Sequence, residues 1–552
     1  MHPLIVNWFS ARRIARPIVL FVAVATCAPS LRADETNSPS AKIVLRNPNE
    51  VLNDLDVVMK LTTPVEQKQL PITKEYIEVF LDGVNRDMPV VIDLKFGGKY
   101  PRQVWNVPIS DFNKFRKTNL AGLGINATQK GGFYELKNAF KGWMKYAAPY
   151  ASIGETQADI PAASPQAGVP DLLGQTADVA VEGANSKIDA AAQADRRKTF
   201  QESRKEILAA IKKKKDEDQS DFDLKKKVFG YQLDEAERFF AESQKLLVRW
   251  QTDAAKNQGI VNFELTPIAG TTLESQIAPL GTAPSHFATI ERSATPILSG
   301  RLNHPLDAER KKTLLDLSTT LRTKAKEEAD SSTTLSTGEK DATRKIADIF
   351  FDMINAGVNA GLMDGFVEVR SNPSGKNTLV CGVRAADGTP IVDIIKLVPE
   401  SRKGRQSKVD ADKEGDVQIH EVTINEKDHP HYQSFFGGPT LYIGSSKETV
   451  WIAVGENALT ELKATIKKRG EGTPAADPVF GKLYVKLQPW MKLREDRDPK
   501  QGNPKLRKLG LEAFSDGADI VHGEMRQEGK KILGNVIIET GILRFAGKAI
   551  AD

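Results

Sequence analysis

The sequence has little cysteine, and this limits how the protein can be stabilised. Only Cys27 and Cys381 occur among 552 residues, and Cys27 lies in a segment that we expect to be removed on export. The one remaining thiol excludes an intramolecular disulfide in the mature chain. Stability must therefore come from burial of apolar side chains, and the hydrophobic fraction of 40% is ordinary for globular proteins.

An excess of charge is also absent once the N-terminal segment is set aside. Residues 1–33 hold four arginines and no acidic residue, and removing those from 77 basic groups leaves 73 against 72 acidic ones, a net charge of +1. Without a positive field there is no electrostatic case for nucleic acid or for an anionic membrane surface as partner. No second apolar run of about 20 residues follows, so we predict no transmembrane helix after the signal.

Motifs for catalysis are missing as well. The chain has no G-x-S-x-G elbow, P-loop, H-E-x-x-H or EF-hand loop. The acidic pair Asp54 and Asp56 lies near a predicted turn, where Asp is favoured without any acid–base role. Cys381, in the apolar segment TLVCGV, has the pattern of a buried small hydrophobe and not of a nucleophile. We therefore predict no catalytic residue and no cofactor.

The only close set of histidines is His429 and His431, with His420 nearby. In an extended segment residues i and i+2 face the same way, so this pair could hold a metal with Asp428 or Tyr432. The intervening proline and the polar flanks favour a surface loop, and we predict no metal site.

The N-terminus has the pattern of a secretory signal peptide. Arginines precede the apolar run IVLFVAVA at 18–25, which is too short to span a bilayer. Cleavage after Ala33 fits the small-residue rule, and lipidation at Cys27 is the alternative. We expect an exported protein of the periplasm, cell envelope or extracellular space.

The remaining pattern predicts an α+β fold, with antiparallel sheets packed against amphipathic helices and two similar lobes flanking a helix-rich middle region. Short strands are expected at 56–61, 76–81, 90–96 and 104–109, a helix at 233–247, and closing strands within 520–545. The expected units are a signal peptide at 1–33, an N-terminal α+β lobe at 43–153, a low-complexity linker at 154–198, a middle region ending in two long helices at 199–365, and a C-terminal α+β lobe at 366–552.

The stretch 439–466 has the clearest local pattern. Apolar runs at 441–443 and 450–454 flank a polar turn and predict a hairpin, and Leu459, Leu462 and Ile466 follow at helical spacing. Trp451 is expected in the core of this unit.

A short internal match favours a duplicated lobe. ASIGETQA at 151–158 aligns with IAVGENAL at 452–459, so that Gly154 falls on Gly455. Ser110 lies 44 residues before the first glycine and Asp393 lies 62 before the second, and the charged segment 399–416 would supply the difference of 18 as an insert.

Four segments carry a resemblance to a known group: SHFATIERSATPILSGRLNHPLD, NAGLMDGF, WIAVGENALTELK and ETGILRFAGKAIA. Together they resemble uncharacterised secreted proteins of planctomycete-type bacteria. The resemblance implies export and an α+β fold, and it supplies no catalytic residues.

These observations favour an exported, non-enzymatic envelope protein that acts by binding or scaffolding. A carrier of an apolar ligand is one alternative, and an apolar cavity of several hundred Å3 would distinguish it. A hydrolase with dispersed residues is another, for which a buried cluster of perturbed carboxylates or histidines would be evidence.

Overall fold

A computed structural model of the protein describes residues 40–60, 75, 77–78, 81–95, 102–161, 169–185, 190–213, 217–361, 363–423, 430–470, 475–497 and 504–551. The predicted signal peptide with its cleavage site after Ala33, the alternative lipidation site Cys27, and most of the strand expected at 76–81 lie outside these residues. Within them the chain has the predicted α+β composition, with many helices and one large antiparallel sheet.

The first ten strands of the chain form one half of that sheet, which we call the N-terminal half. Every neighbouring pair in it is antiparallel. From the outer edge inward the strands are β4 (Ile125–Lys130), β5 (Phe133–Asn138), β6 (Gly142–Ala147), β7 (Tyr150–Gly154), β3 (Arg102–Pro108), β2 (Val90–Lys95), β1 (Ser40–Leu45), β8 (Val179–Ala184), β9 (Ser243–Asp253) and β10 (Gln258–Pro267).

Ten later strands form the C-terminal half, again with antiparallel neighbours throughout. From its outer edge inward these are β15 (Gln406–Glu414), β16 (Val417–Thr423), β17 (Thr440–Ser445), β18 (Thr449–Gly455), β14 (Asn377–Arg384), β13 (Asp364–Ser371), β12 (Pro296–Asn303), β20 (Val479–Lys486), β21 (Ile520–Glu528) and β22 (Lys531–Glu539).

The two halves have the same connectivity. If the strands of each half are numbered in chain order, both halves read 4-5-6-7-3-2-1-8-9-10 from edge to centre. The last strand of each, β10 and β22, pair antiparallel at the centre and join the halves into one 20-stranded sheet. Two short strands, β11 (Pro284–Ser285) and β19 (Ala475–Ala476), form a separate ladder.

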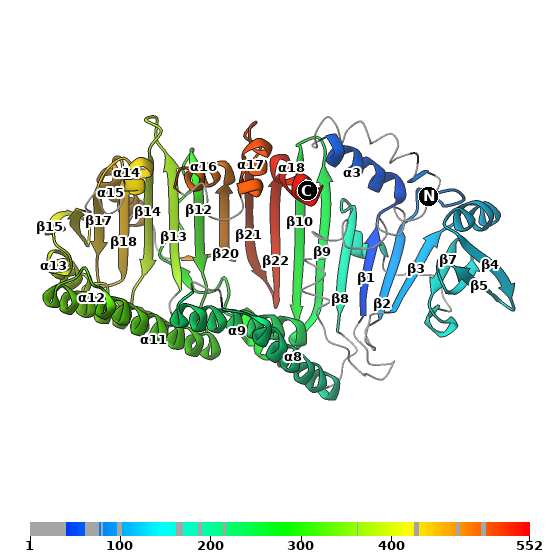
Figure 1. The fold of residues 1–552 in the computed structure, drawn as a ribbon, viewed down its shortest axis with the longest axis horizontal. Coiled ribbons are helices and arrows are strands. Elements are labelled where there is room, and N and C mark those ends of the chain that lie inside the picture. The colour runs from blue at the N-terminus through cyan, green and yellow to red at the C-terminus, as the bar shows by residue number, and fades with distance from the viewer. Residues whose placement is uncertain are drawn as a thin grey trace.

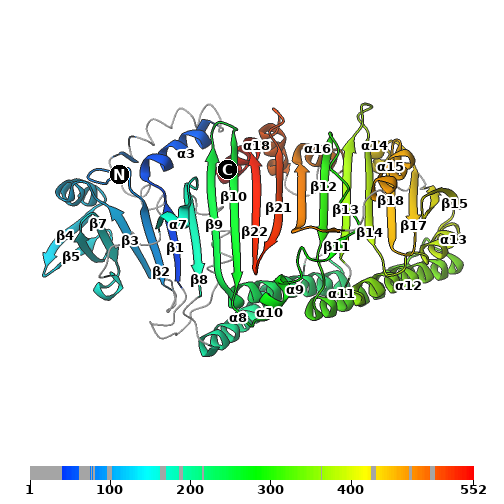
Figure 2. The same ribbon diagram turned by 180° about the vertical axis from the view of Figure 1, so that it is seen from behind.

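Helices lie along the two long edges of the sheet, where the strands end (Figures 1 and 2). Along one edge run α8 (Ala190–Ala210), α9 (Gln219–Glu242), α11 (Ala308–Ser331) and α12 (Thr337–Asn359), and along the other α3 (Pro48–Lys60), α14 (Pro430–Phe436), α16 (Leu487–Arg497), α17 (Pro504–Ala513) and α18 (Thr540–Ala551). In the described part of the chain, none of the helices combines the length and the apolar character that crossing a membrane requires.

One face of the sheet carries a helix-covered apolar cluster in each half, and two further buried clusters, around Leu136 and around Leu265, lie on the opposite face. In the C-terminal half, α15 (Ala458–Gly470) places Leu462 and Ile466 against Trp451 and its strand neighbours. In the N-terminal half, α7 (Val169–Leu173) packs Leu172 and Leu173 against residues of β1, β2, β8 and β9. The helix that covers each half follows the same strand in chain order, β7 or β18.

The local predictions with the strongest periodicity are confirmed. The hairpin and helix of 439–466 are present as β17, β18 and α15. The two long middle helices are α11 and α12, joined by a short loop. Their starts are fixed by capping: the Asp307 side chain accepts from the backbone N–H of Arg310, and that of Ser336 accepts from the N–H of Glu339.

The segment 154–198 differs from the predicted linker. It contributes α7, the start of α8, and β8, which pairs with β1 on one side and β9 on the other. Its composition is poor in large apolar side chains, but a six-residue strand flanked on both sides needs few of them, since its backbone hydrogen bonds and neighbouring strands supply the order.

Three further segments also differ from prediction. Residues 56–61, expected as a strand, lie largely in α3; residues 243–247, expected in a helix, begin β9; and residues 540–545, expected within the closing strands, begin α18 (Thr540–Ala551). The charged segment 399–416, treated above as an insert, contains strand β15. The polar alternation of β15 suits an edge strand, where charges oppose pairing with a further chain.

Candidate functional site

A groove of about 800 Å3 lies on the sheet in the C-terminal half, beside the central pair of strands β10 and β22. Its walls are almost wholly apolar, and its volume falls within the range of small-molecule sites. The side chains that line it come from seven strands and one loop and include Phe263, Met363, Val383, Leu483, Met525 and Val536.

The groove opens on the face of the sheet opposite to α15. Val380 belongs to the core beneath α15, whereas the next residue, Cys381, lines the groove. Successive side chains of a strand point to opposite faces. The groove and the core beneath α15 therefore share strands but occupy opposite faces.

Glycines make this face hollow, and four of them line the groove: Gly300, Gly365, Gly481 and Gly523. Across five neighbouring strands, Val367, Gly300, Leu483, Gly523 and Val536 lie directly opposite one another. Gly300 and Gly523 flank Leu483 on its two sides and contribute no side chain to the row. At Gly523 an added Cβ would lie 2.4 Å from the Asn535 carbonyl oxygen, so that position requires glycine.

Large apolar side chains stand exposed around the hollow. Leu483 and Val383 are each 51% exposed, and Met363 and Met525 are also exposed. Contiguous exposed apolar surface of this kind marks binding sites. Covering it gains roughly 25 cal/mol for each Å2 of apolar surface removed from water.

The environment of Cys381 keeps its thiol protonated at neutral pH. Burial raises its pKa to about 11, against a smaller opposing effect of the Ile452 backbone. The thiol is therefore protonated at neutral pH, and only the thiolate is nucleophilic. The predicted character of a small hydrophobe fits this position, but the sequence pattern did not indicate that the residue lines a groove.

Only part of the candidate metal site lies within the described residues. His429 and Asp428 lie outside the described residues, and His431 and Tyr432 belong to α14, which replaces part of the expected loop. His420 is fully buried in β16. Among the residues that the structure describes, no three His, Cys, Asp or Glu side chains gather as a metal site.

His420 is held in one neutral tautomer by its hydrogen bonds. Its Nδ1 accepts from the backbone N–H of Asp410 at 3.0 Å, so Nδ1 carries no proton. The proton is on Nε2, which donates to the Ser445 hydroxyl at 3.1 Å. Burial lowers the pKa of His420, and the Asp410 carboxylate opposes this in part.

Acidification should therefore destabilise the protein through His420. Below pH 6.5 the unfolded chain takes up a proton that native His420 does not, so the free energy of unfolding falls as the pH drops through that value. We expect the melting temperature to fall less between pH 7.5 and 5.5 in His420→Asn, whose amide oxygen can still accept from Asp410. The wild type and His420→Asn must be compared, because a second group titrates in this pH range. Burial and Asp178 raise the pKa of Asp54 to about 6, so its protonation stabilises the native state as the pH falls. Equal losses in both proteins would contradict the assignment.

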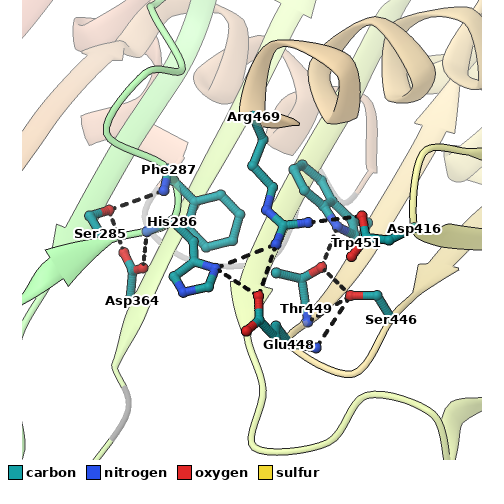
Figure 3. Close-up of polar contacts among 10 residues, drawn as sticks. All are labelled: Ser285, His286, Phe287, Asp364, Asp416, Ser446, Glu448, Thr449, Trp451 and Arg469. Atoms are coloured by element: carbon teal, nitrogen blue, oxygen red, sulfur yellow. Dashed lines mark hydrogen bonds and ion pairs between the residues drawn. The ribbon is translucent and has the colours of Figure 1, made fainter. Parts of the chain in front are cut away.

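A polar cluster on the core face joins the segment before β12 to α15 (Figure 3). Asp364 accepts from the Ser285 hydroxyl and from the His286 backbone N–H, each at 2.7 Å. The His286 ring instead faces Arg469 and Glu448, with Nδ1 3.7 Å from the Glu448 carboxylate. Burial lowers the pKa of His286, followed by the effect of the Arg384 charge.

This cluster has the residue types of a catalytic triad but not its geometry. A triad requires the histidine to accept the proton of the serine hydroxyl. Here Ser285 donates to Asp364, while the imidazole of His286 lies beside Arg469. The cluster therefore links the segment before β12 to β13 and α15 by hydrogen bonds. It does not support nucleophilic catalysis.

The described residues form an α+β fold whose large antiparallel sheet carries an open apolar groove. Comparison of the chain with protein-family models, with curated proteins and with solved structures finds no match.

Proposed function

We propose that this is an exported, non-enzymatic protein that binds an apolar small molecule in the groove around Leu483. The observation that carries the proposal is the groove itself: about 800 Å3 with almost wholly apolar walls, on a sheet face opposite to the core beneath α15. Among the functions that the sequence left open, an apolar groove of this size supports a carrier of an apolar ligand. Export and membership of the secreted planctomycete-type group rest on the sequence pattern alone.

The proposal includes a duplicated origin for the two halves. Identical strand order in both halves supports it. So does the alignment of 151–158 with 452–459, because these segments lie on β7 and β18, which hold the same place in that order. One residue before each segment, on the same two strands, the fully buried Tyr150 and Trp451 occupy corresponding positions.

The decisive test places a charge in the groove and the same charge just outside it. Leu483→Asp should weaken binding of N-phenyl-1-naphthylamine, an uncharged apolar fluorophore, at least about tenfold, because a carboxylate is costly to cover with hydrocarbon. Ile452→Asp is the matched control: Ile452 is 37% exposed, shares the face through its partner Cys381, and does not line the groove.

Cys381 provides a second readout in a Cys27→Ser background. Occupancy of the groove should slow alkylation of this thiol, measured at alkaline pH, where more of it is ionised. Unchanged fluorophore affinity in Leu483→Asp, or no protection of Cys381, would refute the proposal. Equal losses in Leu483→Asp and Ile452→Asp would instead indicate a broad docking face for a macromolecule.

A further inference from the structure

The directly opposed residues Val367, Gly300, Leu483, Gly523 and Val536 form a row that we call the groove row. This row continues across the centre of the sheet into the N-terminal half. Val536, at the end of the groove row, lies directly opposite Val261 of β10. From Val261 the pairing register leads outward through Trp250, Val179, Leu45 and Val90. Directly opposed residues share a face of the sheet, so all ten side-chain positions lie on the groove face.

The Val261–Val536 pair marks a pseudo-twofold axis. Strand by strand, the row Val261, Trp250, Val179, Leu45, Val90 on β10, β9, β8, β1, β2 corresponds to the row Val536, Gly523, Leu483, Gly300, Val367 on β22, β21, β20, β12, β13. Both rows begin and end with a valine, and Val179 of β8 corresponds to Leu483 of β20. Gly523 and Gly300, the two glycines of this row, are matched by Trp250 and Leu45.

The Trp250 ring contacts a glycine of the neighbouring strand β10. A Cβ added to Gly259 would lie 2.3 Å from the Cη2 atom of the Trp250 ring, so the indole covers that glycine. Its Nε1 donates to the Thr252 hydroxyl at 3.1 Å, which fixes the ring. Phe263 covers the corresponding glycine, Gly534, on the other side of the axis, and it lines the groove.

We propose that the groove is one of two pseudosymmetric sites, and that the chain's own Trp250 and Leu45 fill the other. An aromatic ring beside a branched aliphatic group occupies the closed site, so the open site takes a ligand with a flat aromatic or hydrocarbon body and binds one molecule per chain. This inference rests on the proposed function, because it specifies the ligand class and stoichiometry of the same groove.

The test opens the closed site and fills the open one in the full-length protein. Titration with N-phenyl-1-naphthylamine should give one site in the wild type and two in Trp250→Ala/Leu45→Ala. Gly300→Leu, which copies Leu45 into the groove, should lower affinity at least tenfold. A Cβ at Gly300 meets only Val367 closely, at 3.3 Å, so the backbone tolerates this change. Gly357→Leu on α12, with open space around it, is the matched control.

The outcomes separate the two proposals. A wild type that binds no fluorophore overturns the proposed function and this inference with it. A wild type that binds one molecule, with a folded double variant that also binds only one, overturns the paired sites alone. If the double variant fails to show a cooperative melt, the single variant Trp250→Ala takes its place, and an unchanged stoichiometry there has the same meaning. Unchanged affinity in Gly300→Leu also contradicts the correspondence of the rows.

Discussion

Replacing Trp451 with alanine should lower the free energy of unfolding by about 3 to 5 kcal/mol, the range for truncating a large buried aromatic side chain. Trp451 is fully buried beneath α15, and its ring packs edge-on against Phe287 and Phe366 with centroids 5.5 and 5.7 Å away. Its Nε1 also donates to the Thr449 hydroxyl at 2.8 Å. Alanine would leave a cavity and a buried hydroxyl without this donor.

The control for this variant is Trp105→Ala on β3. Trp105 is 43% exposed, and its indole donates only to the nearby Gln103 side chain. Its truncation should cost no more than about 1 kcal/mol, as expected of an exposed side chain. Chemical denaturation measures both values. Equal costs in the two variants would show that Trp451 does not hold the core of the C-terminal half.

Replacing Gly455 with alanine should cost about 3 kcal/mol or more, although only a methyl group is added. Gly455 ends β18 with a φ of 111°, a conformation that side chains disfavour. The added Cβ would lie 2.1 Å from the backbone carbonyl oxygen of Asn377 on the neighbouring strand β14. Because that atom belongs to the backbone of a paired strand, relief requires the two strands to separate.

Gly154, the residue aligned with Gly455 in the sequence, is the natural control. It ends β7 next to Val104, as Gly455 ends β18 next to Thr378. A Cβ at Gly154 would make ordinary contacts of 3.4 Å or more with side-chain atoms of Asp159, Ile160 and Val104. We expect Gly154→Ala to cost under about 1 kcal/mol. Thermal and urea melts of the two variants would contradict this account if Gly154→Ala proved the more damaging.

The sequence did not predict the candidate site. Its walls run from Phe263 to Val536 and belong to seven strands that the chain forms at different points. No spacing rule connects such residues, because the pairing of β12 with both β13 and β20 brings them together. The sequence identified Cys381 only as an apolar residue. Which face of β14 borders the groove depends on the strands that pair with it.

Several element predictions failed for the same reason. Residues 179–184 have too few large apolar side chains to indicate a strand, yet β8 is ordered by β1 and β9 on its two sides. The segment 243–247 continues the helical pattern of α9, but Leu247 is buried among residues of β1, β2 and β8 in the sheet. Tertiary pairing overrides weak local preference in both segments.

The sequence by itself determined the features that depend on neighbours within a few turns of the chain. Apolar spacing predicted the hairpin and helix of 439–466 and the two long middle helices, and the apolar run 450–454 placed Trp451 in the core. The tertiary structure alone decided which strands pair at the centre of the sheet and which side chains lie in one row across the paired strands. Val261 and Val536 are directly opposed although 275 residues of sequence separate them. Whether that shared face is filled, as at Trp250, or hollow, as at Gly523, depends on side chains that only strand pairing brings into one row.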